Sequence, residues 1–240
     1  MSHVMVPFAN GKGGVGKTAL ACSYAAVRAS EGADVILADV NEEQRTALAW
    51  SQVRDHNHLL PKIRVEAVSA RQALEMVGRC DVLVVDTPGW TDKSTLALAK
   101  KSTFMVIPTG PNPTYELAPT VRLLHGFRAE GIEPWRLGVV FSRFSTDVAA
   151  ARDEDQFARA YLSAAGYGAL DGYVRNDPAY GSVLAEGYGM TEVAGQKQLF
   201  TEAMQMMQTI SKSVASAERR FGRTAAQDRS KDRDRGGRDQ

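Results

Sequence analysis

Cysteine is scarce in this chain, since its 240 residues include two, Cys22 and Cys80. Two isolated cysteines that form no CxxC pair argue against a disulfide framework and against a cysteine-built metal site. The four histidines show no ligand spacing among themselves, so we expect no histidine metal site. A reduced, cytoplasmic setting is the expectation that follows.

Long apolar runs are absent as well. No stretch approaches the roughly 20 residues of a membrane-spanning helix, and the first residues do not resemble a signal peptide. We therefore expect no membrane partner. Met1–His3 leads almost directly into an apolar strand, so we also expect no separate domain before the fold. The remaining composition, 44% hydrophobic and 24% charged, is that of an ordinary globular protein with room for a sizeable core.

Net charge is nearly absent too, but the +1 of the whole chain hides an asymmetry. Residues 219–240 hold eight Lys/Arg and four Asp/Glu, a net of +4, which leaves −3 for residues 1–218. A basic end on a mildly acidic body can favour an anionic polymer such as DNA, and it can equally be a solvated end. The segment Asp228–Gln240 is rich in Arg, Asp and Gly, and its composition predicts disorder.

Short β-branched runs alternate with helical stretches along the chain. Most of these runs are continuously apolar, which is typical of strands buried on both faces of a parallel sheet. The predicted strands are Val4–Ala9, Asp34–Asp39, Ile63–Val68, Asp81–Asp86, Thr103–Pro108, Arg136–Phe141 and Leu170–Arg175. The predicted helices are Lys17–Ser30, Ala70–Val77, Thr114–Ala129, Ala149–Ala165 and a last one from about Gln196 to Arg220. The alternation predicts a single α/β domain over residues 1–220, built on a doubly wound, mostly parallel sheet flanked by helices, with 221–240 as a basic tail.

The segment from Gly11 to Thr18, GKGGVGKT, matches the eight-residue phosphate-loop pattern in full. It follows the first strand and opens a helix, which is the context that the pattern requires. Its glycines let the backbone wrap a phosphate, and the helix N-terminus adds positive potential. We expect ATP on the loop residues, namely Gly11, Lys12, Gly13, Gly14, Val15, Gly16, Lys17, Thr18 and the following Ala19. Lys17 would contact the β and γ phosphates, and the Thr18 hydroxyl would ligate Mg²⁺.

Lys12 is an additional lysine that a phosphate loop does not need within one subunit. With it, the loop resembles that of the deviant Walker A ATPases, the ParA/MinD family, and the resemblance extends at motif level from Val4 to Ser216. In that family the extra lysine reaches across a nucleotide-sandwich dimer to the partner's phosphates. The resemblance therefore implies an ATP-dependent homodimer in which Lys12 and Lys17 both serve catalysis.

Further motifs of the same family follow along the chain. Asp39 ends the second predicted strand where the first switch begins, and Asp81–Gly89 (DVLVVDTPG) is similar to the Walker B strand and second switch. The resemblance implies that Asp39 and Asp86 hold Mg²⁺ through water. A late segment of the family contacts adenine, and we carry that role onto Arg175 and Asn176.

The first switch departs from the family's pattern. An Asp-x-Asp-Pro-Gln sequence is usual there, whereas this chain reads Asp39-Val40-Asn41-Glu42-Glu43. The amide of Asn41 stands where a second carboxylate would help to position the attacking water. We therefore expect a slow hydrolysis step involving Asn41, unless Glu42 or Glu43 supplies the carboxylate instead.

The resemblance implies an ATPase of the small plasmid-partition type, which lacks an N-terminal DNA-reading domain. Such a protein binds duplex DNA without sequence preference, associates with the nucleoid and answers to a ParB-like adaptor. The candidate DNA contacts are Lys212, Arg219, Arg220 and Arg223. Alternatives are a related ATPase for conjugative transfer or another cargo, and a MinD-like membrane-cycling ATPase. An iron–sulfur reductase subunit needs cysteines after Asp86, whereas both cysteines precede it.

Overall fold

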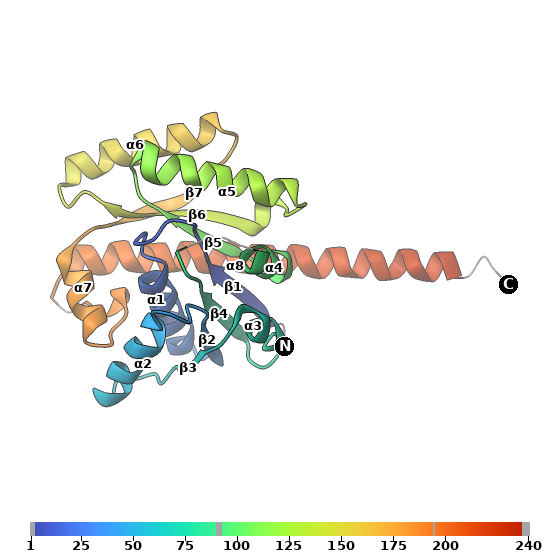
Figure 1. Ribbon diagram of the computed structural model, residues 1–240, viewed down its shortest axis with the longest axis horizontal. Coiled ribbons are helices and arrows are strands. Elements are labelled where there is room, and N and C mark those ends of the chain that lie inside the picture. The colour runs from blue at the N-terminus through green and yellow to red at the C-terminus, as the bar shows by residue number, and fades with distance from the viewer. Residues whose placement is uncertain (1–2, 90–92, 194, 237–240) are drawn as a thin grey trace.

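The sheet has seven parallel strands, in the order β3-β2-β4-β1-β5-β6-β7 (Figure 1). The computed structural model describes residues 3–89, 93–193 and 195–236, with side chains described as far as residue 221. The strands are β1 (Val4–Phe8), β2 (Val35–Asp39), β3 (Arg64–Ala67), β4 (Val82–Asp86), β5 (Met105–Thr109), β6 (Leu137–Phe144) and β7 (Ala169–Arg175). The predicted single α/β domain with a parallel sheet is confirmed.

Helices cover both faces of this sheet (Figure 1). The α-helices are α1 (Lys17–Ser30), α2 (Thr46–His56), α3 (Ala70–Glu75), α4 (Lys93–Lys101), α5 (Ala118–Ala129), α6 (Val148–Ala164), α7 (Pro178–Ala185) and α8 (Lys197–Gly236). Three shorter turns are η1 (Pro113–Leu117), η2 (Pro134–Arg136) and η3 (Met190–Glu192). The prediction for α1 agrees with the structure and the predicted helix Thr114–Ala129 covers most of η1 and all of α5, whereas α2, α4 and α7 were not among the predicted helices. The last helix runs to Gly236, beyond the predicted end at Arg220, and the division of the chain at residue 220 stays a prediction.

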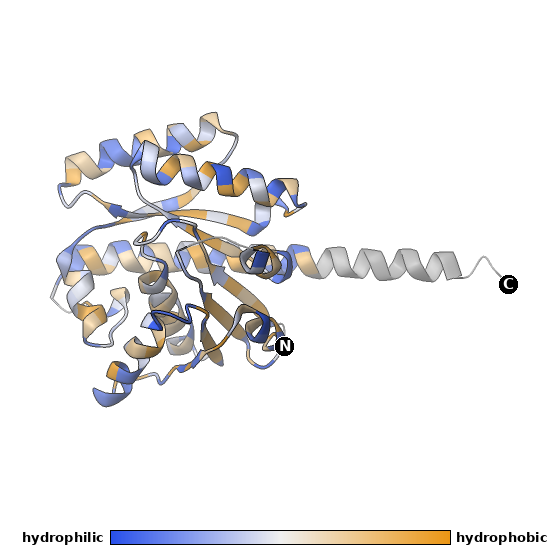
Figure 2. Cartoon of the chain, viewed as in Figure 1, coloured by the Kyte–Doolittle hydropathy of each residue, from blue (hydrophilic) through white to orange (hydrophobic). Residues whose placement is uncertain are grey.

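Two apolar cores lie on the two faces of the sheet. Along β1, Val4, Val6 and Phe8 face the core under α1 and α8, while Met5 faces the core under α3 to α6. This alternation is the period of two that a strand imposes on its side chains. All residues of β1, β2, β4 and β5 are buried, which explains their continuous apolar runs. Figure 2 shows the same concentration of hydrophobic residues along the central strands.

The topology places one set of loops where a ligand can bind. Because all strands are parallel, their carboxyl ends share one edge, and the strand order reverses between β1 and its neighbours β4 and β5. Such a switch point leaves a crevice at the carboxyl ends of the strands. The phosphate loop follows β1 at this point. Among the described residues, no helix combines the length and apolarity that crossing a membrane requires.

Candidate functional site

The phosphate loop connects β1 to α1 through two glycines in the left-handed conformation. Gly14 has φ of 74° and Gly16, the N-cap of α1, has φ of 83°, a region that other residues rarely adopt. No side chain caps α1, so its first N–H groups remain available to an anion. The local geometry therefore suits a phosphate at the helix N-terminus.

Two side chains of β6 hold the loop through its backbone carbonyls. The Ser142 hydroxyl donates to the Val15 carbonyl at 2.7 Å, and an Arg143 Nη1 donates to the Gly14 carbonyl at 2.7 Å. Both residues end β6 and lie more than a hundred positions from the loop. The sequence interpretation missed them because a lone Ser-Arg pair at a strand end carries no local signal. They hold the carbonyls of Gly14 and Val15 in place.

Asn10 anchors the start of the loop. Its side chain is buried and donates to the Pro108 carbonyl at 2.7 Å and to the Thr120 hydroxyl at 3.0 Å. Its Oδ1 accepts from the Lys12 N–H at 3.0 Å. This amide ties β5 and α5 to the backbone of Lys12, and it too was missed from the sequence.

The loop's second lysine, Lys17, is 7% exposed, and its ammonium donates to the Lys12 carbonyl at 2.9 Å. Burial lowers the pKa of Lys17, while the nearby Asp86 carboxyl opposes that shift. The Lys12 side chain, by contrast, is exposed and forms no hydrogen bond or ion pair with the rest of the described chain. The two lysines therefore have different surroundings within one subunit.

Asp86, at the end of β4, meets the first turn of α1. The Thr18 hydroxyl donates to Asp86 Oδ2 at 2.7 Å. The other oxygen, Asp86 Oδ1, is buried and has no partner within the described residues. Burial, together with the charge of Asp39, raises the pKa of Asp86 to about 7. An unpaired carboxylate oxygen beside a threonine hydroxyl is an oxygen donor set of the kind that Mg²⁺ takes together with water.

Asp39 lies next to Asp86, because the two residues are register partners on adjacent strands β2 and β4. Its Oδ1 accepts from the Asn41 N–H at 3.1 Å, and its Oδ2 accepts from the Leu48 N–H on α2 at 3.1 Å. Asp39 thus ties the first switch to the strand ends. The two predicted carboxylates and Thr18 are brought together, although their metal role stays a prediction.

Asn41 forms a closed turn with Gln44. The Asn41 Oδ1 accepts from the Gln44 N–H at 3.3 Å, and its Nδ2 donates to Gln44 Oε1 at 3.1 Å. Both residues line a cavity of about 530 Å³ over the phosphate loop, whereas Glu42 and Glu43 are exposed and do not line it. Gln44 had no assigned role from the sequence.

Residues of both switch segments line that cavity together with the phosphate loop. Its lining consists of Gly13, Gly14, Gly16, Lys17, Thr18, Ala19, Asn41, Gln44, Thr46, Thr87 and Gly89. Gly89 approaches the loop so closely that an added Cβ would lie 3.0 Å from the Gly13 Cα. Only glycine fits there without movement of the backbone.

Arg175 and Asn176 line a second cavity, of about 410 Å³, on the other side of Ala19 and beside Ser142. Arg175 is 8% exposed and is engaged within the chain, because its Nε lies 3.0 Å from Glu202 Oε1 and its Nη1 donates to the Thr146 carbonyl at 2.9 Å. The cavity adjoins the phosphate loop, which suits a base attached to a bound nucleotide. The adenine contact of both residues stays a prediction.

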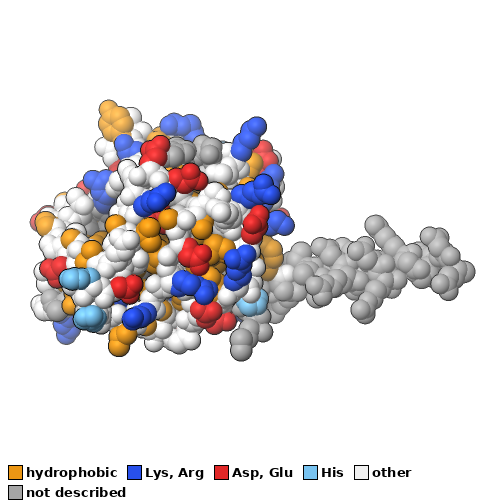
Figure 3. Space-filling view, turned by 60° about the horizontal axis from the view of Figure 1, so that its bottom comes forward, with side chains coloured by type: hydrophobic (Ala, Val, Ile, Leu, Met, Phe, Trp, Pro, Cys, Tyr) orange, Lys and Arg blue, Asp and Glu red, His pale blue; other side chains and the backbone are white. Residues whose placement is uncertain are grey.

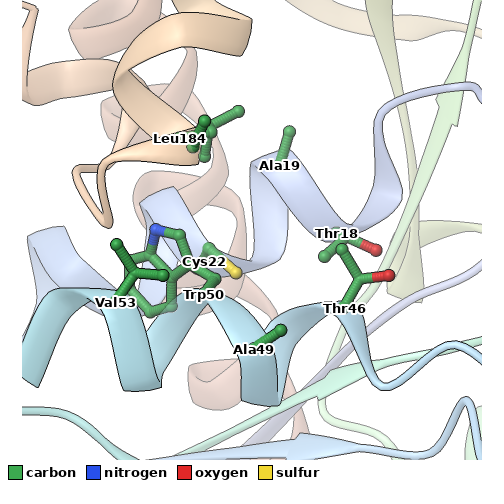
Figure 4. Close-up of a pocket in the computed structure, with 9 residues that line it drawn as sticks. Thr18, Ala19, Cys22, Thr46, Ala49, Trp50, Val53 and Leu184 are labelled. Carbon is green, nitrogen blue, oxygen red and sulfur yellow. The ribbon is translucent and has the colours of Figure 1, made fainter.

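A third cavity, of about 430 Å³, is almost wholly apolar and lies between α1, α2 and α7 (Figure 4). Figure 4 shows Trp50 beside Cys22, with Leu184 above them. Trp50 donates its ring N–H to the Tyr188 carbonyl at 3.0 Å, and burial raises the pKa of the Cys22 thiol. Thr18 and Thr46 line both this cavity and the phosphate cavity. The third cavity therefore lies in the interface through which α2 packs against α1 and α7.

Comparison with known proteins agrees with this geometry. A family model described as the CobQ/CobB/MinD/ParA nucleotide binding domain matches residues 6–219. A search of curated protein sequences finds no match to the chain.

Solved structures with the same fold are similar at low sequence identity. McdA(D38A) of Cyanothece in complex with ATP has 14% identity and a TM-score of 0.68, covering 88% of this chain and 98% of that one. MinD of Aquifex aeolicus, in a MinC:MinD complex, has 14% identity and a TM-score of 0.69, covering 87% and 96%. A putative plasmid partition protein of Borrelia burgdorferi B31, bound to AMPPNP, has 13% identity and a TM-score of 0.64, covering 87% and 98%.

Proposed function

The chain belongs to the CobQ/CobB/MinD/ParA nucleotide-binding family, and from that premise we propose that it is an ATPase that dimerises on ATP and Mg²⁺ and positions DNA. The observation that carries the proposal is Lys12. Its side chain is exposed, next in sequence to Gly13 of the phosphate-cavity lining, and has no partner in the described part of its own chain. It is therefore available to the phosphates of a second subunit, while Lys17 serves its own.

Within one subunit the proposed chemistry is divided between a few groups. Lys17 and the loop N–H groups would hold the phosphates, and the Thr18 hydroxyl with the carboxyls of Asp39 and Asp86 would hold Mg²⁺, the latter two through water. The metal, when bound, neutralises charge that develops on the transferring phosphoryl group. Asn41 and Gln44 line the cavity with amide groups that would orient the attacking water.

DNA binding is the finer part of the proposal. Figure 3 shows Lys and Arg side chains interspersed with Asp and Glu on the face turned forward, so the body shows no broad field of one sign there. The candidates Lys212 and Arg219 are exposed on α8, and Arg220 follows them. Arg223 lies outside the described side chains. A small patch on each subunit is doubled by dimerisation, so ATP would control DNA affinity through avidity.

The partner and the cargo are proposed by analogy with the partition type. A ParB-like adaptor would stimulate hydrolysis, and the ATP dimer would associate with the nucleoid. A related ATPase for conjugative transfer or for another cargo shares this chemistry, and the similarity to McdA and MinD keeps that second function in view. A MinD-like membrane cycle is less well supported, because the segment Asp228–Gln240 is rich in Arg, Asp and Gly and lacks the bulky apolar residues of a membrane-binding amphipathic helix.

The test is DNA binding at defined nucleotide states. With ATP and Mg²⁺ the protein should sediment or scatter light as a dimer and should bind duplex DNA of unrelated sequences equally, whereas ADP should weaken both. Affinity should fall linearly on a log–log plot against salt. Equal affinity with ATP and ADP, or a requirement for one operator sequence, would show that the positioning function is wrong.

A further inference from the structure

We propose that the C-terminal end of α4 and the exposed face of α8 form one DNA-binding surface, and that Arg136 and Phe221 join this surface to the nucleotide site. The proposal rests on the proposed function, because it names the surface and the internal connection that would make DNA binding depend on ATP.

Arg136 holds the end of α4. Its guanidinium is 8% exposed, and its Nη2 donates to the carbonyls of Ala99 and Lys100 at 2.7 and 3.1 Å and also to that of Ser102. The last carbonyls of a helix have no partner within the helix, and a cation there also offsets the helix dipole. Arg136 therefore fixes where α4 ends.

The same guanidinium contacts α8. Its central carbon lies 4.8 Å from the centroid of the Phe221 ring, a cation–π distance. Trp135 packs edge-on against Phe221 with centroids 5.7 Å apart, and the Arg220 guanidinium lies 5.7 Å from the Trp135 ring. Phe221 is thereby held between two residues of η2. We call Trp135, Arg136 and Phe221 the η2 junction.

The η2 junction brings basic side chains of two helices together. Because one guanidinium touches both the Lys100 carbonyl and the Phe221 ring, the end of α4 and residues 219–221 of α8 are neighbours. Lys101 and Arg219 are exposed and have no ion pair in the described part of the chain. Lys100 is paired with Glu130 at 3.0 Å. The unpaired cations on the two helices can thus contact phosphates of one duplex.

The other end of α4 lies beside the phosphate loop, because Thr95 and Leu96 line one cavity with Asn10 and Gly11. The second switch ends at Gly89, against Gly13 of the phosphate loop, and α4 begins at Lys93. A helix of nine residues is about 13 Å long and moves as a unit. A shift of the second switch on binding a γ-phosphate is a known kind of transition in P-loop proteins. Such a shift would move the carbonyls that accept hydrogen bonds from Arg136. Because Arg136 also contacts the Phe221 ring, the movement would reach α8.

The first measurement is the ratio of DNA affinities with ATP and with ADP. In Phe221→Leu the ring contacts are lost while an apolar side chain remains. We expect the ratio of DNA affinity with ATP to that with ADP to fall at least about fivefold, while the affinity of the protein for ATP itself is unchanged. Phe200→Leu is the matched control, because Phe200 is on the same helix and similarly exposed, at 40% against 37%, and has no ring contact within the described residues. Where wild type binds DNA more tightly with ATP than with ADP, an unchanged ratio in Phe221→Leu would overturn the connection.

The surface is tested by charge. Lys101→Glu should lower DNA affinity and reduce the salt slope by about one to two. Lys62→Glu is the control, since Lys62 is exposed and precedes β3, at the opposite edge of the sheet. Equal effects of the two substitutions would overturn the role of α4.

A readout without DNA separates this inference from the proposed function. In 5-fluorotryptophan-labelled protein, the ¹⁹F resonance of Trp135, assigned with Trp135→Phe, should differ between ADP and ATP states in wild type and not in Phe221→Leu. A Trp135 resonance that ignores the nucleotide in wild type would overturn the connection. A resonance that responds while DNA binds equally with ATP and ADP would leave the connection standing and overturn the proposed function.

Discussion

We expect the rate of hydrolysis to depend most directly on Asn41. An amide can orient a water through its oxygen but cannot accept a proton, so we expect a slow basal rate and a long-lived ATP dimer. Asn41→Asp should accelerate single-turnover hydrolysis about tenfold, roughly 1.4 kcal/mol off the barrier.

The alternative is that Glu42 or Glu43 supplies the carboxylate. Both are exposed and lie outside the lining of the phosphate cavity, so Glu42→Gln and Glu43→Gln serve as matched controls that should change the rate little. A large loss of hydrolysis rate in Glu42→Gln or Glu43→Gln, with little change in Asn41→Asp, would show that this glutamate, and not residue 41, supplies the carboxylate.

Substitutions of Lys12 and of Lys17 should impair different steps, dimerisation and ATP binding respectively. Lys17→Ala removes the buried ammonium from the phosphate cavity and should abolish ATP binding by the monomer. Lys12→Ala removes a side chain with no described partner and should leave monomer binding intact while preventing the ATP-dependent dimer. Calorimetry measures the first effect and light scattering the second. A Lys12→Ala protein that still dimerises with ATP would contradict the sandwich arrangement.

Asp86 gives a pH dependence to the stability of the nucleotide-free protein. Its pKa in the folded chain is raised from 3.8 to about 7, so folding favours the protonated form. Its favourable contribution is complete below about pH 4 and is lost as pH rises through 7. At pH 8 the buried charge costs on the order of 4 kcal/mol.

Asp86→Asn removes this charge and keeps an oxygen for the Thr18 hydroxyl. Without nucleotide and Mg²⁺, the variant should gain stability over wild type in urea unfolding, and the gain should grow between pH 5 and pH 8. A gain that does not change with pH would contradict the assigned pKa.

Helix α2 depends on one buried arginine. Arg54 is 1% exposed, forms a forked pair with Glu192 at 2.9 and 3.2 Å, and donates to the carbonyls of Leu60, Pro61 and Gly187. It thereby fastens α2, which carries the Leu48 N–H that binds Asp39, to the segment between α7 and η3.

Removing one partner of a buried pair typically costs about 3–5 kcal/mol. We expect Arg54→Met to lose stability in that range in urea unfolding. Arg71→Ala is the control, because Arg71 is 89% exposed in a surface pair with Glu75 and should change stability by under about 0.5 kcal/mol. Similar losses in the two variants would contradict the role of Arg54.

The elements differ in how far their sequences determine them. The central strands were predictable because burial on both faces leaves continuous apolar runs, as in Val82–Asp86. Helix α7 was missed because it is short, holds Gly181 in its interior and buries only Tyr180, so its sequence shows little helical periodicity, although Asp177 caps it and Pro178 suits its first position. In the site, the loop was predictable because its motif is contiguous. The supports from Asn10 and Ser142 were not, since their partners lie up to 127 positions away.

Across the whole molecule, DNA affinity should follow the charge at residues 219 and 220 of α8. Arg219→Glu reverses an exposed charge with no described contact and should weaken binding equally for unrelated sequences while flattening the salt slope. Arg220→Glu also loses its contact with Trp135, so its effect should be larger. Filter binding over a salt series measures both. Sequence-dependent losses would contradict a phosphate-only interface.

The order of strands also has a consequence for the time at which this protein can first work. β1 is made first, yet it pairs with β4 and β5, as in Val4 with Val82 and Phe8 with Val106. At a synthesis rate of roughly 5–20 residues per second, the first strand waits about 5–20 s for its neighbours. During that interval the sheet that positions the phosphate loop has not formed. The loop therefore cannot bind ATP, and ATP binding cannot stabilise the nascent chain. In chains that are interrupted before Thr109, the apolar strand β1 should stay exposed, and chaperones and proteases should recognise it.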